Sequence, residues 1–183
     1  MTEVRFPKPY ADFVARLRVP CGFLLVAAFA WFSRPALRSL AYGIPVSAAG
    51  LALRAWAAGH LDKNRELALS GPYAYVRNPL YLGTLLVAAG FAVASRSVGL
   101  AMLFAVVFLL VYLPAIALEE QHLSKLFPRY AEYAARVPAL VPRAPHDRAP
   151  GRFQFALYRK NQEYQALAGF LAGVAWLTWK AIR

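Results

Sequence analysis

Five apolar runs, each close to the length of a membrane-spanning helix, dominate this chain. A helix of about 20 apolar residues crosses the hydrocarbon core of a bilayer. The candidate spans are about 14–32, 40–59, 80–95, 98–118 and 166–182. Because a backbone in lipid must satisfy its hydrogen bonds internally, such runs predict helices. We therefore expect an all-α, polytopic membrane protein with about five transmembrane helices and with interfacial helices on the cytoplasmic side; four spans are the alternative.

The composition is typical of the same class of protein. Hydrophobic residues make up 60% of the chain and charged residues 16%, against about a half and a quarter in soluble domains. The single cysteine, Cys21, excludes an intramolecular disulfide and a cysteine-built zinc site. The net charge of +12 comes from basic residues in short loops between apolar runs. We therefore expect no nucleic-acid partner, which would need a basic stripe on a soluble domain.

The basic residues also predict an orientation. With a cytoplasmic N-terminus, fifteen lysines and arginines lie on the cytoplasmic side and five on the opposite side. This excess agrees with the positive-inside rule. It predicts that the polar loops 60–79 and 119–165 are both cytoplasmic, where they can meet. If the protein is bacterial, the membrane is the plasma (inner) membrane.

Residues 71–83 read Gly-Pro-Tyr-Ala-Tyr-Val-Arg-Asn-Pro-Leu-Tyr-Leu-Gly and form the most distinctive motif. Gly-Pro indicates a turn, and Asn78-Pro79 is typical of a helix start, with Asn78 as the cap. The structural interpretation of Arg77 and the tyrosines is anchoring at the membrane surface. Their convergence at a helix N-terminus, which favours anionic groups, instead indicates a ligand site.

A second polar cluster, Glu-Glu-Gln-His at 119–122, follows the fourth apolar run. It is either a solvated interfacial helix or the place where a carboxylate holds a cation, an amine or a hydroxyl donor. Glu119 and His122 have the spacing of metal ligands in helical bundles, but the partner copy that such sites need is missing. We therefore predict no metal site. A short amphipathic helix is expected over 127–138, a proline-rich linker over 139–151, and a polar helix over 152–165.

Taken together, the two clusters resemble the integral-membrane methyltransferases, which include isoprenylcysteine carboxyl methyltransferases and phospholipid methyltransferases. The resemblance rests on Gly-Pro-Tyr…Arg-Asn-Pro-Leu-Tyr-Leu-Gly at 71–83 and Glu-Glu…Leu…Phe-Pro-Arg-Tyr…Tyr…Arg-Val-Pro at 119–138. It covers about 50–140 of a single domain expected over 1–183. The linker and last helix in 141–183 lie outside it.

The resemblance implies S-adenosylmethionine-dependent methyl transfer to a lipid-like or prenylated acceptor at the cytoplasmic membrane face. The cofactor residues that it implies are Arg65, Glu66, Leu67, Ala68, Tyr73, Asn78, Pro79, Leu80, Tyr81 and Glu119. Arg77 joins them because a guanidinium can pair with the carboxylate of the cofactor. The methyl acceptor, the catalytic residues and the substrate-binding residues stay unassigned.

Two positions depart from the family pattern. Asn78 stands where the family usually has histidine, and asparagine cannot titrate near neutral pH. Proton shuttling from this position is therefore excluded. Ala115 stands where eukaryotic isoprenylcysteine enzymes carry an arginine for the substrate carboxylate, which weakens the case for a prenylcysteine substrate.

Two alternatives from other classes stay open. An NADPH-dependent membrane reductase of the sterol-reductase type shares part of the first motif, but commonly has an acidic residue where this chain has Thr84. A non-catalytic membrane scaffold or small transporter predicts no cofactor-sized pocket between the two polar clusters.

Overall fold

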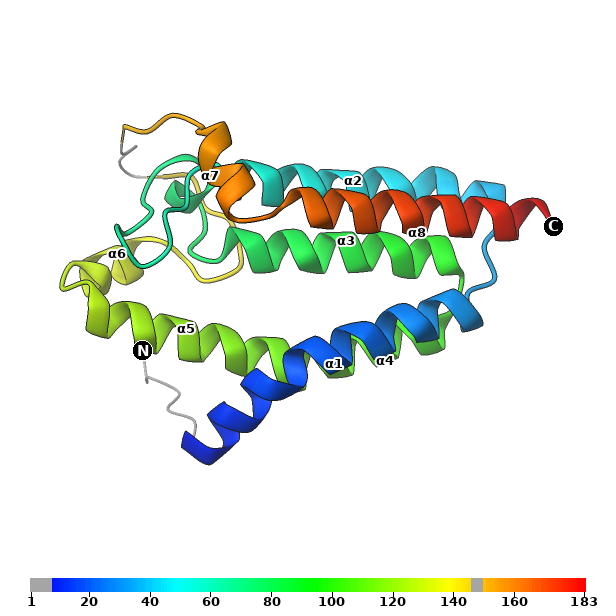
Figure 1. Ribbon diagram of the computed structural model, residues 1–183, viewed down its shortest axis with the longest axis horizontal. Coiled ribbons are helices and arrows are strands. Elements are labelled where there is room, and N and C mark those ends of the chain that lie inside the picture. Colours follow the sequence, from blue (N-terminus) through cyan, green and yellow to red (C-terminus); the bar gives the residue numbers. More distant parts are fainter. Residues whose placement is uncertain (1–7, 146–149) are drawn as a thin grey trace. The chain divides into compact units, whose positions relative to one another are not determined.

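The computed structural model of the protein describes residues 8–145 and 150–183, which form helices, turns and loops but no β-strand. The described residues contain eight α-helices, a 3₁₀ helix η1 and a π-helix η2 (Figure 1). In chain order they are α1 (Lys8–Phe32), α2 (Leu37–Ala58), η1 (Gly71–Ala74), α3 (Pro79–Ser95), α4 (Val98–Val107), η2 (Phe108–Tyr112), α5 (Leu113–Leu126), α6 (Tyr130–Arg136), α7 (Phe155–Lys160) and α8 (Tyr164–Ile182). The prediction of an all-α chain is confirmed.

All five apolar runs are helical. In the described part of the chain, one helix is long and apolar enough to cross a membrane: Val98–Leu126, with 29 residues, whose most apolar 18-residue stretch has a mean hydropathy of 2.7. Pro20–Phe32 and Pro79–Ser95 are shorter apolar helices. The count of five spans therefore stays a prediction. Arg5 and Arg148, which the charge argument counts on the cytoplasmic side, lie outside the described residues.

The chain divides into two compact units. Unit 1 consists of the chain up to Ser47, of Ala88–Gln121 and of Ala172–Arg183. Unit 2 consists of Ala48–Val87 and His122–Leu171. Helices α2, α3, α5 and α8 each contribute residues to both units. All residues of the first motif (71–83) and of the polar segment 152–165 therefore belong to unit 2, whereas Glu119 belongs to unit 1.

Unit 1 is held together by two apolar clusters. Helix α1 packs along α4 and η2 (Figure 1), where the buried residues are Val14, Val111 and Ala115. The second cluster joins α2, α3 and α8 through Leu40, Ala94 and Leu177. Burying each such side chain contributes about 1.5–3 kcal/mol relative to exposure in water.

The π-helix η2 has a local cause in the sequence. Pro114 has no backbone N–H, so it cannot donate to the carbonyl of Leu110 four residues earlier. Tyr10 on α1 donates its hydroxyl to that carbonyl at 3.0 Å, and Leu113 N–H donates to the Phe108 carbonyl five residues back. The irregular turn in the long apolar helix thus becomes a contact point for α1.

The last turn of α1 is capped by side chains from α8 within unit 1. The Lys180 ammonium donates to the carbonyls of Ala30 at 3.1 Å and Trp31 at 2.8 Å. The Trp176 indole donates to the Ala30 carbonyl at 3.1 Å. These bonds satisfy carbonyls that a helix end leaves without partners, and a cation there also complements the helix dipole.

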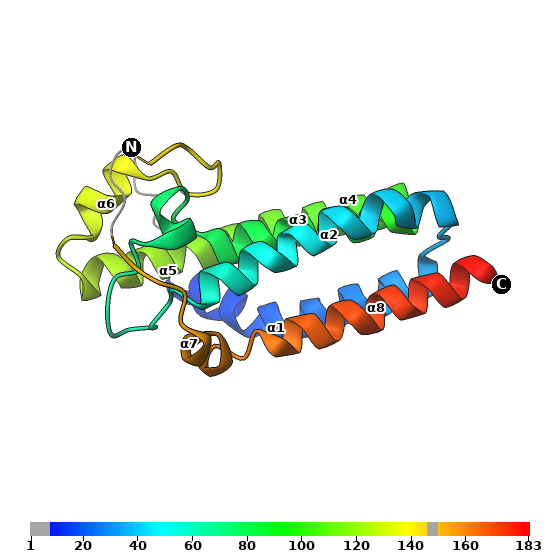
Figure 2. The same ribbon diagram turned by 90° about the horizontal axis from the view of Figure 1, so that it is seen from above.

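Glycines allow α2 and α3 to approach closely; the two helices run side by side in Figure 2. In unit 1, a Cβ atom added at Gly90 would lie 2.4 Å from the Gly43 carbonyl oxygen. In unit 2, a Cβ atom added at Gly83 would lie 2.7 Å from the Gly50 carbonyl oxygen. Small residues at such crossings let helix backbones touch.

Replacing Gly90 with alanine is expected to lower the free energy of unfolding by about 1–3 kcal/mol, because the added methyl overpacks the crossing. The matched control is Gly169→Ala in α8, where nothing lies within 4 Å of the added Cβ; it should be neutral or stabilise by up to about 1 kcal/mol. Unfolding of both variants in detergent measures the difference. A Gly90→Ala protein as stable as Gly169→Ala would contradict the close crossing.

Candidate functional site

The first motif folds as a tight turn that leads into α3. Gly71 has a φ of 60°, a left-handed conformation that glycine adopts without strain. Pro72, Tyr73 and Ala74 of η1 are buried. Helix α3 then begins at Pro79, and the Asn78 carbonyl accepts the first helical hydrogen bond from Leu82 N–H at 3.0 Å. The predicted helix start at Asn78-Pro79 is confirmed.

Helix α6 of the second motif packs on this turn within unit 2. The buried Tyr133 hydroxyl donates to the Tyr73 carbonyl at 2.8 Å. The Arg77 guanidinium donates to the Ala134 carbonyl at 2.9 Å. Residues 71–77 and α6 are thus fixed to one another by side chains that reach backbone carbonyls.

The segment after α6 continues the contact along the backbone. Arg77 N–H donates to the Pro138 carbonyl at 2.9 Å. Asn78 donates both its backbone N–H and its side-chain amide to the Ala139 carbonyl, each at 3.2 Å. The Arg143 N–H donates to the Tyr75 carbonyl at 3.0 Å. The first motif and the end of the second therefore form one folded element within unit 2.

The predicted cofactor residues differ in their exposure. Tyr73, Asn78 and Pro79 are buried. The half-buried residues are Leu67, Ala68, Arg77, Leu80 and Tyr81. Arg65, Glu66 and Glu119 are exposed. The exposed charges are the groups in this set that a dissolved ligand can meet directly, whereas Tyr73 and Asn78 hold the turn.

Glu119 lies on α5 beside the half-buried Glu120. It belongs to unit 1, whereas residues 65–81 belong to unit 2. Its membership of the site therefore stays a prediction. His122, one helical turn further along, approaches Asn64 with its Nε2 atom 3.4 Å from Oδ1. Among the described residues, no three histidine, cysteine, aspartate or glutamate side chains gather as a metal site would need.

The strip 65–68 begins at a turn around Asp62. The Asp62 carbonyl accepts the backbone N–H groups of Arg65 at 3.3 Å and Glu66 at 3.4 Å. Asn64 has a φ of 60°, a conformation that asparagine tolerates better than most residues. The backbone of both charged residues, Arg65 and Glu66, is thus bound to the Asp62 carbonyl.

His60 closes the other end of the same loop. Its Nδ1 atom lies 3.0 Å from the Ser70 hydroxyl, and a Cβ atom added at Gly71 would lie 2.7 Å from the imidazole ring. Burial of the ring lowers the pKa of His60 below the ordinary value of 6.5. Desolvation disfavours the charged imidazolium, because the ring loses part of its contact with water.

A lowered pKa makes stability depend on pH. The unfolded chain binds a proton at His60 more readily than the folded protein does, so stability is expected to fall as pH decreases below 6.5. His60→Gln cannot titrate and should flatten this part of the profile. Thermal unfolding in detergent between about pH 7.5 and 5.5 measures both proteins. An equal decline in the two would show that other groups cause the pH dependence.

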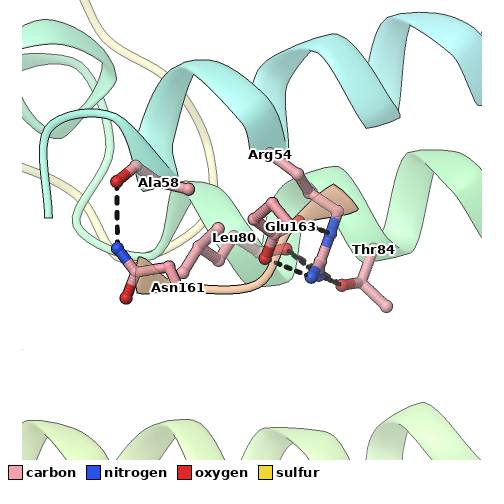
Figure 3. Close-up of polar contacts among 6 residues, drawn as sticks. All are labelled: Arg54, Ala58, Leu80, Thr84, Asn161 and Glu163. Atoms are coloured by element: carbon pink, nitrogen blue, oxygen red, sulfur yellow. Dashed lines mark hydrogen bonds and ion pairs between the residues drawn. The ribbon is translucent and has the colours of Figure 1, made fainter. Parts of the chain in front are cut away.

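The sequence analysis did not predict an ion pair in unit 2 between the half-buried Arg54 and the buried Glu163 (Figure 3). Arg54 on α2 binds both carboxylate oxygens of Glu163, with Nη2–Oε1 at 2.7 Å and Nε–Oε2 at 3.0 Å. It also donates to the Thr84 hydroxyl and the Leu80 carbonyl on α3. This cluster joins α2, α3 and the turn before α8.

Asn161 binds the end of α2 from the same turn (Figure 3), with its side-chain amide nitrogen 3.0 Å from the Ala58 carbonyl oxygen. The predicted continuous helix over 152–165 was wrong: α7 ends at Lys160, Gln162 has a φ of 57°, and α8 begins at Tyr164. No periodic pattern marks this break. The unusual presence of Arg54 inside an apolar run was the one available signal, because such a charge needs a partner.

An apolar groove of about 220 Å³ lies beside the ion pair in unit 2. Its lining residues come from α2, α7, α8 and the turn between the last two: Ala48, Leu51, Ala52, Ala55, Tyr158, Glu163 and Leu167. The groove is open at this place because the alanine side chains are too small to fill it. The groove offers an aliphatic surface with Glu163 and Tyr158 as its polar members.

The regular elements of the described residues are all helices, one of them of membrane length, and the turn of the first motif is bound to α6 of the second motif. A family model described as phospholipid methyltransferase matches residues 21–130. That match covers more than half of the chain, so the chain belongs to the phospholipid methyltransferase family. The resemblance seen in the two motifs is thereby confirmed.

Three relatives extend the comparison. The cobalt-zinc-cadmium resistance protein CzcN of Cupriavidus metallidurans is 36% identical over 115 residues, which cover 62% of this chain and 52% of that protein. The nickel-cobalt-cadmium resistance protein NccN of Alcaligenes xylosoxydans xylosoxydans is 32% identical over 153 residues, with 75% and 70% covered. The protein-S-isoprenylcysteine O-methyltransferase of Schizosaccharomyces pombe is 28% identical over 144 residues, with 75% and 61% covered.

The chain thus spans about half the length of the first of these relatives. No solved structure matches it. The family model and the isoprenylcysteine methyltransferase favour a methyltransferase over a reductase of the sterol type.

Proposed function

We propose that the protein transfers a methyl group from S-adenosylmethionine to a lipid-like acceptor at the cytoplasmic face of a membrane. The observation that carries the proposal is the packing of the first motif on α6 and on residues 138–143, in a chain that belongs to a methyltransferase family. The two motifs are far apart in the sequence and share no apolar periodicity. A common ligand site accounts for their joint presence.

The chemistry of the exposed residues suits this cofactor. S-adenosylmethionine carries a carboxylate, an ammonium, ribose hydroxyls and a methyl group bound to a sulfonium. The methyl group is what the cofactor supplies to the reaction. Arg65 offers a guanidinium for the carboxylate, and Glu66 and Glu119 offer carboxylates for the ammonium or the hydroxyls. In this proposal, the site is supported by three buried residues, Tyr73, Asn78 and Pro79. It is bordered by five half-buried residues: Leu67, Ala68, Arg77, Leu80 and Tyr81.

The protein's part in the reaction is to orient the acceptor and exclude water. Alignment of a nucleophile with the methyl group supplies much of the rate in a displacement. A carboxylate acceptor needs no base, whereas an amine must lose a proton to water or to a group other than Asn78. The groove beside Glu163 supports a lipid-like acceptor because it gives an aliphatic chain an apolar surface.

The proposal includes the setting of the enzyme. A single domain would cross the bilayer about five times, with its N-terminus in the cytoplasm and, in a bacterium, in the inner membrane. Lipid would surround the apolar helices, which carry many exposed large side chains such as Phe23, Trp31 and Leu109. Nucleic acid has no part in it.

A methyl-transfer assay tests the proposal. Membranes that contain the protein are incubated with S-adenosylmethionine labelled in its methyl group, and lipids and membrane proteins are then extracted. We expect label in a lipid-soluble product, at a level well above that of membranes without the protein. Absence of label from every fraction, together with oxidation of NADPH by the same membranes, would contradict the proposal and favour the reductase.

A further inference from the structure

The turn between α7 and α8 holds the end of α2 by two side chains. Asn161 closes α7, and the positive φ of Gln162 redirects the chain. Asn161 and Glu163 consequently both face α2, where their partners Ala58 and Arg54 lie one helical turn apart (Figure 3). Two contacts from one turn thus fix the last part of α2.

The same turn also fixes the chain beyond α2. The amide nitrogen of Asn161 donates a second bond to the Leu61 carbonyl at 2.8 Å, besides the bond to Ala58. The Lys160 ammonium pairs with the Asp62 carboxylate, whose side chain is 19% exposed. The backbone from Ala58 to Asp62 is therefore held by two consecutive residues.

Asp62 passes this restraint to the strip 65–68. Its carboxylate is bound by Lys160, while its carbonyl accepts the N–H groups of Arg65 and Glu66. The strip's exposed guanidinium and carboxylate therefore lie where Asp62 sets them. Loss of the restraint on Asp62 would let both charges move.

The other end of the strip is touched by the same C-terminal segment. Gln154 N–H donates to the Gly59 carbonyl at 2.9 Å. Gly151 lies so close to Ser70 that an added Cβ atom would be 2.2 Å from the Ser70 hydroxyl oxygen. Residues 151–163 therefore contact the loop before and after the strip.

We propose that residues 151–163 form a strap that positions the strip 65–68 for the cofactor, with Asn161 as its principal positioning residue. The inference rests on the proposed function, since it concerns the same cofactor. It goes further because it gives the C-terminal segment, which lies outside the matched family region, a role in cofactor affinity. The strap acts through the end of α2 and Asp62 and does not itself touch the cofactor.

The main variant is Asn161→Asp, which keeps the shape but puts a second oxygen where the amide donated to two carbonyls. Lys180→Ala is the matched control, because it also removes two bonds to carbonyls at a helix end, here that of α1. Calorimetric titration of the full chain with S-adenosylmethionine is expected to show Kd raised about tenfold in Asn161→Asp, because a strip released from its restraint must be ordered again when the cofactor binds. Lys180→Ala should stay within about twofold of the wild type, because it removes no bond near the strip.

The two parameters of the titration separate positioning from folding. A merely structural role would lower the fraction of molecules that bind and leave Kd unchanged, whereas positioning raises Kd at full occupancy. If Asn161→Asp does not fold, Asn161→Ala takes its place, since it removes the donor without adding a charge. If the wild type binds normally and Kd is unchanged in the variant, the proposed role of the strap is contradicted, whereas the proposed function is not. No binding by the wild type would instead overturn the proposed function and the strap's role with it.

Trypsin gives a readout that needs no cofactor. It cleaves after Lys63 and Arg65, which are exposed at and before the start of the strip. Cleavage at these two bonds is expected to be several-fold faster in Asn161→Asp than in the wild type and in Lys180→Ala. Equal rates in all three proteins would show that the strap does not restrain the strip.

Discussion

Replacing Glu163 with alanine is expected to lower the free energy of unfolding by about 3–5 kcal/mol. Both oxygens of this carboxylate bind the Arg54 guanidinium, and the two side chains are only 8% and 23% exposed. The variant leaves Arg54 without its counter-charge in a place with little water. The Thr84 hydroxyl and the Leu80 carbonyl cannot replace a formal negative charge.

Unfolding in detergent, followed by circular dichroism, measures this loss. The matched control is Glu132→Ala, which breaks an exposed pair with Arg136 at 3.6 Å and should cost less than about 1 kcal/mol. Removing both charges of the pair, as Arg54→Met with Glu163→Leu, is expected to restore most of the stability. A Glu163→Ala protein no less stable than Glu132→Ala would show that the pair does not hold α2 to the turn before α8.

Replacing Glu119 with glutamine is expected to weaken S-adenosylmethionine binding by about tenfold or more. Hydrogen bonds to charged groups contribute about 1.5–3 kcal/mol, and the amide lacks the negative charge that attracts an ammonium. The exposed position of Glu119 on α5 makes a large change in protein stability unexpected. Calorimetric titration measures the change in Kd.

Glu120→Gln is the control for this prediction. Consecutive residues on a helix point about 100° apart, so Glu119 and Glu120 cannot present their carboxylates to a ligand in the same direction. Glu120→Gln should therefore bind S-adenosylmethionine within about twofold of the wild type. Equal effects in the two variants would contradict the choice of Glu119 as the carboxylate that holds the cofactor.

The helices could be predicted because their signals are local. Apolar runs of membrane length indicate helices in any context, and Asn78-Pro79 marks a helix start through its own backbone preferences. The structure has a helix over each run and begins α3 at Pro79. The π-helix was not predicted: Pro114 removes one helical hydrogen bond locally, but the partner of the freed Leu110 carbonyl, the Tyr10 hydroxyl, comes from a distant part of the chain.

The packing of the first motif on α6 depends on tertiary contacts that no spacing encodes. Arg77 and Asn78 were expected to face a ligand, yet the structure also uses them to bind the carbonyls of Ala134 and Ala139. A sequence pattern identifies such residues as unusual. It does not distinguish a residue that holds the site together from one that touches the ligand.

The contacts of the turn before α8 with α2 could not be predicted from the sequence for a different reason. Glu163 and Asn161 are single polar residues in a polar segment, so neither stands out from its neighbours. Their direction depends on the left-handed backbone of Gln162, for which glutamine gives no signal. Arg54, a charge inside an apolar run, was the one residue whose position could have suggested a partner elsewhere in the chain.

The most direct test of the account is calorimetric titration of the purified full chain with S-adenosylmethionine and with its demethylated product. NADPH serves as the control ligand under the same conditions. We expect saturable binding of the first two at one site per chain and no heat of binding with NADPH. Saturable binding of NADPH without binding of S-adenosylmethionine would contradict the assignment of this chain to cofactor-dependent methyl transfer.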